Sequence, residues 1–431
     1  MAEPGLAGRG APGKQPTEAA RAGRMSQTEF IALMAMLFAT IAFSIDAMLP
    51  AMPEIAASLS PEAPNRAQLV VTSFVLGMGL GTLFTGPLSD AFGRKPVIVA
   101  GAALYILGAA LAWAAQSLEL MLAARLVQGL GAAAPRVVAV AIVRDLYEGR
   151  RMAQIMSFVM MVFALVPALA PALGAAIIWA TGWRAIFAAF LLFAAVSVVW
   201  MSLRLDEPLA RERRRPFGLA MYARGLREVF SHATVVLPIG VLSLVFAMLF
   251  ALLSSIHSVI AETFGRGAGF PLWFGLIAVL AATGSILNAR IVMRLGMRRV
   301  IRAALLTQIL VSLAVAGLYA SGGLPPALGF ALFIAWAVGV FFMIGLTTGN
   351  LNALALVPLG HIAGLAASVV TGVSTVGAVL VAVPIGLAFD GTPLPLVLGV
   401  LACAALGAAL MALVPGSDTG PGVAPGVAHR P

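Results

Sequence analysis

The sequence is poor in the residues on which enzymes, metal centres and disulfide-bonded domains depend. Its 431 residues include one cysteine and four histidines, and charged residues make up only 10% of the chain. A single cysteine, Cys403, excludes an intrachain disulfide. The histidines, at His232, His257, His361 and His429, are scattered and form no cluster with cysteine or carboxylates at metal-ligand spacing. We therefore expect no enzyme active site, no metal and no cofactor.

Three other features are absent. No GxxxxGK[ST] loop is present to bind nucleotide phosphates, and the longest hydrophilic loop is too short for an ATPase domain. The formal net charge is +10, but the basic residues form no stripe interleaved with aromatic residues, so we expect no nucleic-acid partner. Residues 1–24 have no apolar core, which argues against a cleavable signal peptide or a membrane span there.

Apolar residues dominate what remains. They make up 61% of the chain and the mean hydropathy is +1.02, whereas soluble domains are about 45–50% apolar. Lipid must therefore be the solvent. The apolar runs are about 20 residues long, as helices crossing a bilayer are, and lack the alternation of barrel strands. We predict an all-α membrane protein with twelve transmembrane helices, at about residues 28–50, 66–89, 96–115, 121–143, 155–179, 184–203, 233–257, 270–293, 299–320, 325–349, 363–388 and 393–414.

The basic residues predict the orientation of these helices. Most of the 27 lysines and arginines fall in segments that share one side of the membrane if the N-terminus is cytoplasmic. Only Arg66, Arg184 and Arg266 fall in loops on the other side, while Arg125 and Arg136 lie within the fourth span. Because positively charged loops stay in the cytoplasm, we expect a multi-pass protein of the inner membrane with both termini cytoplasmic.

A hydrophilic stretch near the middle of the chain separates two similar parts. It contains RERRRPFG, which favours a solvated basic linker at the lipid headgroups. GRKPV, which begins at Gly93, is echoed by GMRRV, which begins at Gly296, although Met293 stands where Asp90 would be. Two such six-helix halves are a transporter architecture. We expect a monomer with a disordered cytoplasmic N-terminus, a first half, a cytoplasmic linker, a second half and a disordered tail, at residues 1–27, 28–203, 204–232, 233–414 and 415–431.

A dense group of polar and turn-forming residues separates the second and third predicted helices. In the stretch GPLSDAFGRKPV, Gly93 offers the backbone freedom for a tight turn, and the cytoplasmic side accounts for Arg94 and Lys95. Asp90 is different, because a negative charge is unfavourable at the C-terminal end of a helix. We expect it to have a partner, either a base at another helix end or a helix N-terminus. An ordinary basic turn is the alternative.

This stretch resembles the loop signature between the second and third helices of the major facilitator superfamily. The matching residues are Gly86, Leu88, Asp90, Gly93, Arg94 and Lys95. The resemblance implies the fold of that superfamily, with two pseudo-symmetric six-helix halves. It also implies that the loop is a conformational latch, in which the aspartate contacts the other half and helps to hold the inner side shut.

Further motifs resemble those of proton-driven antiporters in the same superfamily. RxxQGxG is similar to their fourth-helix motif, and ALVPALAPALG to their fifth-helix motif. The matching residues are Arg125, Gln128, Gly129 and Gly131 in the former, and Pro167, Pro171 and Gly174 in the latter. DAMLPAMPEIA, AIVRDLYEG, GWRAIF and AFDGTPLPL narrow the resemblance to the bicyclomycin- and chloramphenicol-resistance branch of the twelve-span drug:proton antiporters.

The resemblance implies a secondary active transporter that exchanges small amphipathic compounds for protons. A carrier of one metabolite, an amino-acid derivative or a sugar, is the alternative.

Asp46 is the only acidic residue well within an apolar run, in the outer half of the first span. A carboxylate inside the membrane is costly and is by default a functional group. A group whose surroundings alternate between protein and water would bind and release protons during a transport cycle. Asp46 is therefore our candidate site for protons or for a cationic substrate. The alternative is a helix-end aspartate that is already hydrated at the outer face.

The fourth span adds three polar side chains to this candidate site. Arg125 lies at a depth similar to that of Asp46, so the two could pair across the bundle. Gln128 follows one turn further in, and Arg136 lies within about 20° of Arg125 on the helix surface. We expect this stripe to line a cavity. The alternative is that both arginines are structural, and the antiporter branch carries its arginine near Val140 instead, so the resemblance gives Arg136 no role.

Pro167 and Pro171 remove two backbone donors from the fifth span, and Gly174 allows a neighbour to approach closely. We expect a bend there that governs closure of the outer side, with simple packing as the alternative. The second half has no acid deep in the membrane. Asn350 and Asn352 fit helix packing better than substrate binding, and His257 is expected at the outer interface.

Overall fold

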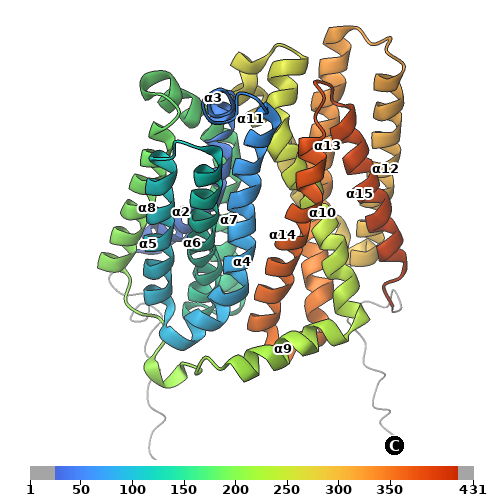
Figure 1. The fold of residues 1–431 in the computed structure, drawn as a ribbon. Coiled ribbons are helices and arrows are strands. Elements are labelled where there is room, and N and C mark those ends of the chain that lie inside the picture. The colour runs from blue at the N-terminus through green and yellow to red at the C-terminus, as the bar shows by residue number, and fades with distance from the viewer. Residues whose placement is uncertain (1–24, 416–431) are drawn as a thin grey trace, which may run out of the picture.

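The computed structural model describes residues 25–415 as a bundle of long helices (Figure 1). Eleven segments are long and apolar enough to cross a membrane, and one of them, Pro326–Leu387, contains two helices joined by the turn η6 (Val357–Ile362). The described residues thus hold twelve spanning helices, which confirms the predicted fold class. They are α2 (Gln27–Asp46), α4 (Leu69–Phe92), α5 (Arg94–Trp113), α6 (Leu118–Leu146), α7 (Gly149–Thr181), α8 (Ala185–Arg204), α10 (Ala233–Ser258), α11 (Phe270–Leu295), α12 (Met297–Ala320), α13 (Pro326–Leu356), α14 (Ala363–Leu387) and α15 (Leu394–Ala412).

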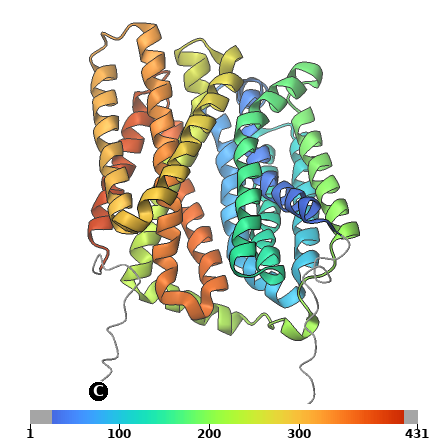
Figure 2. The same cartoon turned by 180° about the vertical axis from the view of Figure 1, so that it is seen from behind.

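The first six spans, α2 to α8, and the last six, α10 to α15, form two groups. The two groups stand side by side in both views (Figures 1 and 2). In the first half, α4 packs on α6, α5 on α6 and α8, and α2 on α7. The second half repeats this order with α11 on α13, α12 on α13 and α15, and α10 on α14. The contacts between halves repeat as well, because α4 packs along α14 while α11 packs along α7. The predicted pseudo-symmetry is therefore confirmed at the level of helix contacts.

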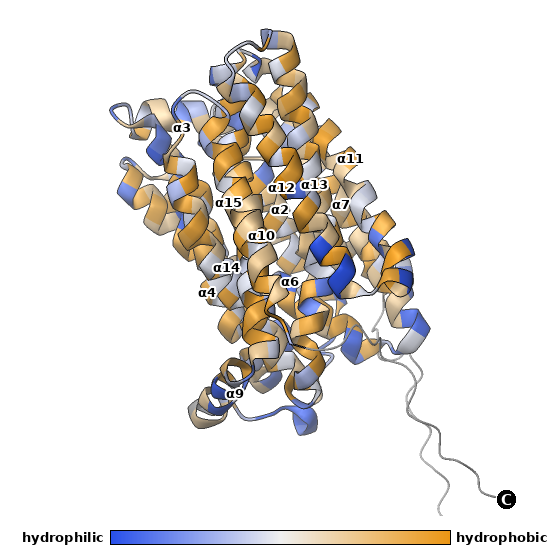
Figure 3. Ribbon diagram, turned by 90° about the vertical axis from the view of Figure 1, so that its right-hand side faces the viewer, coloured by the Kyte–Doolittle hydropathy of each residue, from blue (hydrophilic) through white to orange (hydrophobic). Residues whose placement is uncertain are grey.

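One face of the molecule carries the connection between the halves, and we call it the α9 face. The amphipathic helix α9 (Leu219–Ser231) runs there beneath both halves (Figure 1), and the short turn η3 (Arg211–Arg213) precedes it. Polar residues are prominent in α9 and at helix ends, while apolar residues cover the spans (Figure 3). The remaining short elements lie toward the opposite face: η1 (Leu49–Ala51), α3 (Met52–Leu59), η2 (Pro64–Gln68), η4 (Val259–Thr263) and η5 (Gly267–Gly269).

Glycines let α4 and α6 of the first half approach each other closely. A Cβ atom on Gly77 would lie 2.0 Å from the carbonyl oxygen of Leu126, and one on Gly129 would lie 2.0 Å from that of Phe74. Any larger side chain would push the two backbones apart. Such close packing matters because lipid supplies no hydrophobic driving force between helices. It fixes α6, the helix that carries Arg125 and Arg136, against α4.

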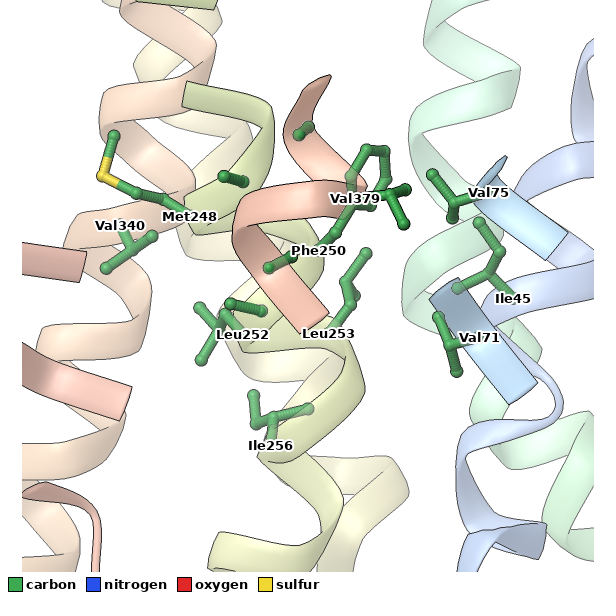
Figure 4. Packing of buried hydrophobic residues seen from close by; sticks show 14 of the residues in the cluster. Ile45, Val71, Val75, Met248, Phe250, Leu252, Leu253, Ile256, Val340 and Val379 are labelled. Atoms are coloured by element: carbon green, nitrogen blue, oxygen red, sulfur yellow. The ribbon is translucent and has the colours of Figure 1, made fainter. Parts of the chain in front are cut away.

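Apolar side chains fill the space between the halves on the side away from α9 (Figure 4). Ile45 and Val71 of the first half face Phe250, Leu253 and Val379 of the second, and all five are buried. Polar contacts lie beyond this apolar seal. The Ser255 hydroxyl donates to Gln68 Oε1 at 2.9 Å, and Asn65 Nδ2 donates to the carbonyl oxygen of Phe389 at 2.6 Å. The halves therefore meet tightly near the opposite face.

Candidate functional site

A cavity of about 220 Å³ lies between the halves on the α9 side of the apolar seal. Its walls come from α2, α4, α6 and α14, and it continues into a wider pocket of about 850 Å³ bounded by α9. Pockets that bind drug-sized molecules usually measure about 300–1,000 Å³. The halves must therefore separate further at the α9 face before the inner cavity admits a compound of that size. Hydroxyl groups reach the lining from Thr82, Ser89, Ser368, Thr371 and Thr375.

Arg136 lines this cavity and its side chain is exposed there. Arg125 and Gln128 do not line it: both are fully buried within the first half. The expectation of one polar stripe facing the cavity is therefore correct for Arg136 and wrong for the other two. The physical reason is depth, because α2 and α4 close over the surface of α6 at the level of Arg125.

Arg125 is the centre of a buried polar cluster that joins three helices. Its guanidinium donates to Gln128 Oε1 at 2.7 Å, to the Ser44 carbonyl oxygen at 3.1 Å and to the Val70 carbonyl oxygen at 3.3 Å. The ring of Phe74 lies 4.3 Å from its Cζ atom, which adds a cation–π contact. These contacts tie α2 and α4 to α6 and leave the guanidinium without exposure to water.

Asp46 is the last residue of α2 and only 5% of its surface is exposed. It lies outside the lining of the cavity, and among residues 25–415 we find neither a hydrogen bond nor an ion pair to its carboxyl group. The suggested pairing with Arg125 is absent from this structure. Arg125 instead bonds the backbone of Ser44, two residues earlier on α2. The alternative of a hydrated aspartate at the outer face does not fit a buried side chain.

Asp90, near the C-terminal end of α4, has both kinds of partner that were expected for it, a basic side chain at the end of another helix and the N-terminal end of a helix. Its carboxylate accepts a hydrogen bond from Arg94 at 2.6 Å within the same turn. It also points at the beginning of α14 in the other half, since a Cβ atom on Gly364 would lie 4.0 Å from Asp90 Oδ2. The N-terminal end of a helix carries partial positive charge, so this approach is favourable.

Gly86 and Gly93 are required for the shape of this region. Gly93 has a φ of 103°, a conformation that other residues rarely adopt. Gly86 lies where α4 crosses α14, and a Cβ atom on it would lie within 2.3 Å of the Ser368 hydroxyl. The stretch that resembles the superfamily signature therefore lies at the contact between the two halves.

The prediction that the cytoplasmic side alone accounts for Arg94 and Lys95 is wrong. Arg94 is only 3% exposed, and besides Asp90 it binds Asp145 of α6 at 2.7 Å. Lys95 donates to the carbonyl oxygen of Leu205 at the end of α8 at 2.5 Å. Both bases thus connect the turn to other helices of the first half.

Sequence reasoning missed two acids, Asp145 and Glu207. Glu207 accepts hydrogen bonds from the backbone N–H groups of Arg94 at 2.8 Å and of Lys95 at 2.9 Å, which caps the N-terminus of α5. The interpretation of this segment as a merely solvated linker is therefore wrong. The only signal in the sequence was that Glu207 is an acid in a basic segment. Nothing in the neighbouring residues indicates that its carboxylate binds backbone groups more than a hundred residues earlier in the chain.

The segment after Glu207 also contacts both halves. The backbone N–H of Arg215 donates to the Asp90 carbonyl oxygen at 3.0 Å, and the Tyr222 hydroxyl donates to the Leu83 carbonyl oxygen at 3.1 Å. Burial raises the pKa of Tyr222, so its hydroxyl keeps the proton that it donates. Glu228 Oε1 lies 2.7 Å from His361 Nε2, which belongs to η6 of the second half, just before α14. α9 is therefore attached to both halves.

Pro167 and Pro171 lie inside α7, which runs without interruption over its full length. Gly174 allows the closest contact on this helix, because a Cβ atom there would lie 1.9 Å from the Ala47 carbonyl oxygen. The fifth-helix motif thus places the backbone of α7 against the residue that follows Asp46. We find no break in α7 at the prolines, so close packing is the observed consequence of the motif.

The polar residues of the second half form internal contacts. Asn350 Nδ2 donates to Asn288 Oδ1 at 2.8 Å and thereby joins α13 to α11, and Asn352 bonds the carbonyl oxygen of Thr348. The expectation of an interfacial His257 is wrong, because its ring is 5% exposed and lies 4.7 Å from that of Phe270. Within residues 25–415, no cluster of histidine, cysteine or carboxylate side chains is arranged to hold a metal.

Two six-helix halves related by pseudo-symmetry, with a cavity between them closed toward one face, define the class of secondary transporters. The particular family follows from comparison: the chain belongs to the Major Facilitator Superfamily, whose family model matches residues 32–382. The predicted resemblance to this superfamily is thereby confirmed, and the chain is a multi-pass transporter of small molecules rather than an enzyme.

The chain is similar to proteins whose names refer to drug resistance. A bicyclomycin resistance protein homolog of Haemophilus influenzae is 30% identical over 308 residues, which cover 71% of this chain and 77% of that protein. Multidrug resistance protein MdtL of Escherichia coli is 34% identical over 161 residues, 37% of this chain and 40% of that protein. Both fit the predicted antiporter branch. In structure, the chain is similar to the xylose transporter XylE of E. coli in a partially occluded inward-open conformation, with a TM-score of 0.70. The alignment covers 91% of this chain and 99% of that one at 14% sequence identity. At that identity the similarity shows the fold alone.

Proposed function

We propose that the protein is a drug:proton antiporter that exports small amphipathic compounds by alternating access. The observation that carries the proposal is Asp46, a buried carboxyl group without a partner, two residues from the backbone group that Arg125 binds. The similarity to a bicyclomycin resistance protein homolog and to multidrug resistance protein MdtL supports export of drugs. A carboxyl group enclosed in one state and hydrated in another would take up and release a proton in each cycle.

The proposed cycle starts from the state described above, which is closed at the opposite face and has its cavity on the α9 side. A compound enters from the α9 face, the halves rock, and the apolar seal around Val71 and Leu253 separates. Protonation of Asp46 from the opposite face then favours release and return. Arg125 takes part as a positioning residue, because it ties the end of α2 to α4 and α6 and so transmits any movement at Asp46 to the helix that carries Arg136.

The α9 face is assigned to the cytoplasm, because most basic residues of the chain fall in segments on that side. We propose that the protein is a monomer of the inner membrane with both termini cytoplasmic. The two halves, at residues 28–203 and 233–414, would move as bodies joined by residues 204–232. Asp90, beside Gly364 at the start of α14, would act as the latch that holds the α9 face when it closes.

Transport can be measured in everted membrane vesicles that hold an imposed, acid-inside pH gradient. We expect amphipathic drugs to collapse the gradient in vesicles with the wild-type protein, and Asp46→Asn to abolish the collapse because the side chain of asparagine does not ionise. Glu54→Gln is the matched control, since Glu54 is an exposed acid of α3 on the opposite face and should leave the collapse unchanged.

Normal coupling in Asp46→Asn would remove Asp46 from the mechanism. A collapse caused by a sugar or an amino-acid derivative, and by no amphipathic drug, would favour the metabolite carrier instead.

A further inference from the structure

The cavity between the halves carries more positive charge than negative. Its charged lining residues are Arg136, Arg144, Arg94 and one acid, Asp90. Asp90 is already bound to Arg94, which also binds Asp145. Among residues 25–415, no hydrogen bond or ion pair reaches the guanidinium groups of Arg136 or Arg144, although both side chains are exposed to the space between the halves.

Arg136 is the deeper of these two free cations. It lies eight residues before Arg144 on α6, about 12 Å further from the α9 face at the rise of an α-helix. The lining that it shares also includes apolar side chains, with Ile41 of α2 and Met78 of α4 among them. Arg144 lies where the cavity joins the wider pocket beneath it. Arg136 at the inner end of the cavity and Arg144 at its mouth are both positively charged, so positive charge lies along the cavity from its mouth inward.

We propose that the cavity selects amphipathic molecules that carry one anionic group, such as an aryl carboxylate, and that Arg136 binds that group. A guanidinium offers a planar pair of donors that fits a carboxylate, and the exchange of water for a charged acceptor is favourable in an apolar cavity. The start of α14, at Ala363 and Gly364, adds the positive end of a helix dipole to the same lining.

The same charges disfavour a cationic amphipath, because nothing in the lining except the engaged Asp90 would balance it. The hydroxyls of Thr82 and Thr371 would serve the polar atoms of an otherwise neutral ring system. This inference rests on the proposed function, since it names the class of compound that the exporter carries. It also separates two roles that one site could combine: Arg136 would hold the compound and Asp46 the proton.

Binding to the purified full-length protein tests the proposal without any gradient. Three probes of one shape serve as ligands: naphthylacetate, naphthylacetamide and naphthylethylamine. We expect wild-type protein to bind the carboxylate about tenfold more tightly than the amide, which corresponds to one hydrogen-bonded charge pair, and the amine most weakly. Arg136→Met should lose the tenfold preference while it binds the amide as wild type does, and Arg136→Lys should keep part of it.

Arg290→Met is the matched control, because Arg290 is an exposed arginine of α11 that lines neither pocket. Its variant should retain the full preference for the carboxylate. Equal or tighter binding of the amide or the amine by the wild-type protein would overturn the proposal, and this comparison needs no variant to fold. A preference for the carboxylate that survives in Arg136→Met would overturn the role of Arg136.

The vesicle assay separates this inference from the proposed function. Carboxylate-selective binding without any collapse of the pH gradient would uphold the anion site and refute proton antiport. A collapse that naphthylethylamine alone causes, that exceeds the passive uptake of protons by this amine in vesicles without the protein, and that Asp46→Asn abolishes would uphold antiport and refute the anion site.

Discussion

At the α9 face, the guanidinium of Arg94 joins side chains from two helices of the first half. It binds Ser89 and Asp90 at the end of α4 and Asp145 near the end of α6, at distances of 2.6 to 2.7 Å. Only 3% of Arg94 is exposed, so its charge depends on these partners for stabilisation. Removing one member of a buried ion pair is costly because it leaves the other charge uncompensated.

We therefore predict that Arg94→Lys destabilises the protein by about 2–4 kcal/mol, because a lysine ammonium cannot bind Asp90 and Asp145 with the geometry of a guanidinium. Thermal unfolding of the purified variant measures the loss. Arg66→Lys is the control: Arg66 pairs with Glu119 at 3.3 Å with both side chains largely exposed, and it should change stability by about 1 kcal/mol or less. Equal effects of the two substitutions would contradict the structural role of Arg94.

Single residues show where sequence reasoning reaches its limit. Asp46 could be located because burial of a carboxylate in an apolar run is visible in the chain itself. Two partners of Arg125 could not, because they are backbone oxygens of Ser44 and Val70 on other helices, and backbone oxygens have no sequence signal. Glu207 was missed for a similar reason: its cap on α5 depends on where α8 ends in space.

Among the elements, α7 and the end of α2 form the contact that bears most directly on the proposed proton site. Gly174 of α7 lies against the carbonyl oxygen of Ala47, the residue after Asp46. The turn that follows, η1, also packs on α7. The position of Asp46 relative to the bundle is therefore set in part by a glycine on another helix.

Gly174→Ala is predicted to destabilise the protein by about 1–3 kcal/mol, or to shift α7 away from α2, because the added carbon would overlap the Ala47 oxygen. Thermal unfolding gives the stability, and the vesicle assay shows whether proton coupling weakens with it. Gly349→Ala is the control, since Gly349 lies inside α13 with no atom within 4 Å of the added carbon. Stability and coupling that match wild type in both variants would show that the contact is unimportant.

The contacts of the helix α9 with the two halves could not be predicted from the composition of the segment. A basic, polar segment between two apolar halves indicates a solvated connection, and the arginines of η3 are indeed exposed. Yet Tyr222 and Glu228 bond to opposite halves, because the amphipathic pattern of α9 turns one side toward the bundle. The periodicity of the sequence predicts that α9 has one side facing the bundle. The residues that this side contacts depend on how the two halves are placed in space.

For the whole molecule, the proposed alternating-access cycle requires the contacts between the halves at the opposite face to break in every cycle. Asn65 of the first half bonds the backbone of Phe389 in the second, beside the exposed Asp390. We predict that a short bifunctional thiol reagent joining Asn65→Cys to Asp390→Cys stops export, and that reduction restores it. Cys403 is the only native cysteine, so Cys403→Ser provides a clean background.

The control joins two residues of the same half on the same face. Arg66→Cys and Glu119→Cys replace a pair whose charged groups lie 3.3 Å apart, and their cross-link should leave export intact. Export that continues with the halves joined would contradict the rocking movement.

The fold of the whole molecule was the most predictable feature. Apolar runs of bilayer length specify the spans. The alternation of basic loops predicts their direction, which stays a prediction. The state of the molecule was not predictable, because the residues of the apolar seal, such as Val71 and Leu253, are equally apolar whether the halves meet or part. The structure presents the state with its cavity toward α9, and the proposed cycle would require the same sequence to adopt a second state.

The two seams between the halves are not held equally at the α9 face. Near the α9 face, Gly86 lies against Ser368 and Asp90 approaches Gly364 along α4–α14, whereas the close approach of a glycine between α7 and α11 lies toward the opposite face, where Gly275 near the start of α11 lies against the Ala168 carbonyl oxygen. Rotation about α4–α14 would therefore widen the α7–α11 seam most, and these two helices have the least buried share of all the spans. In the proposed cycle, an amphipathic compound dissolved in the adjacent leaflet would then reach the α9 side of the cavity through this seam, so its partition into lipid, rather than its concentration in water, would govern the rate of export.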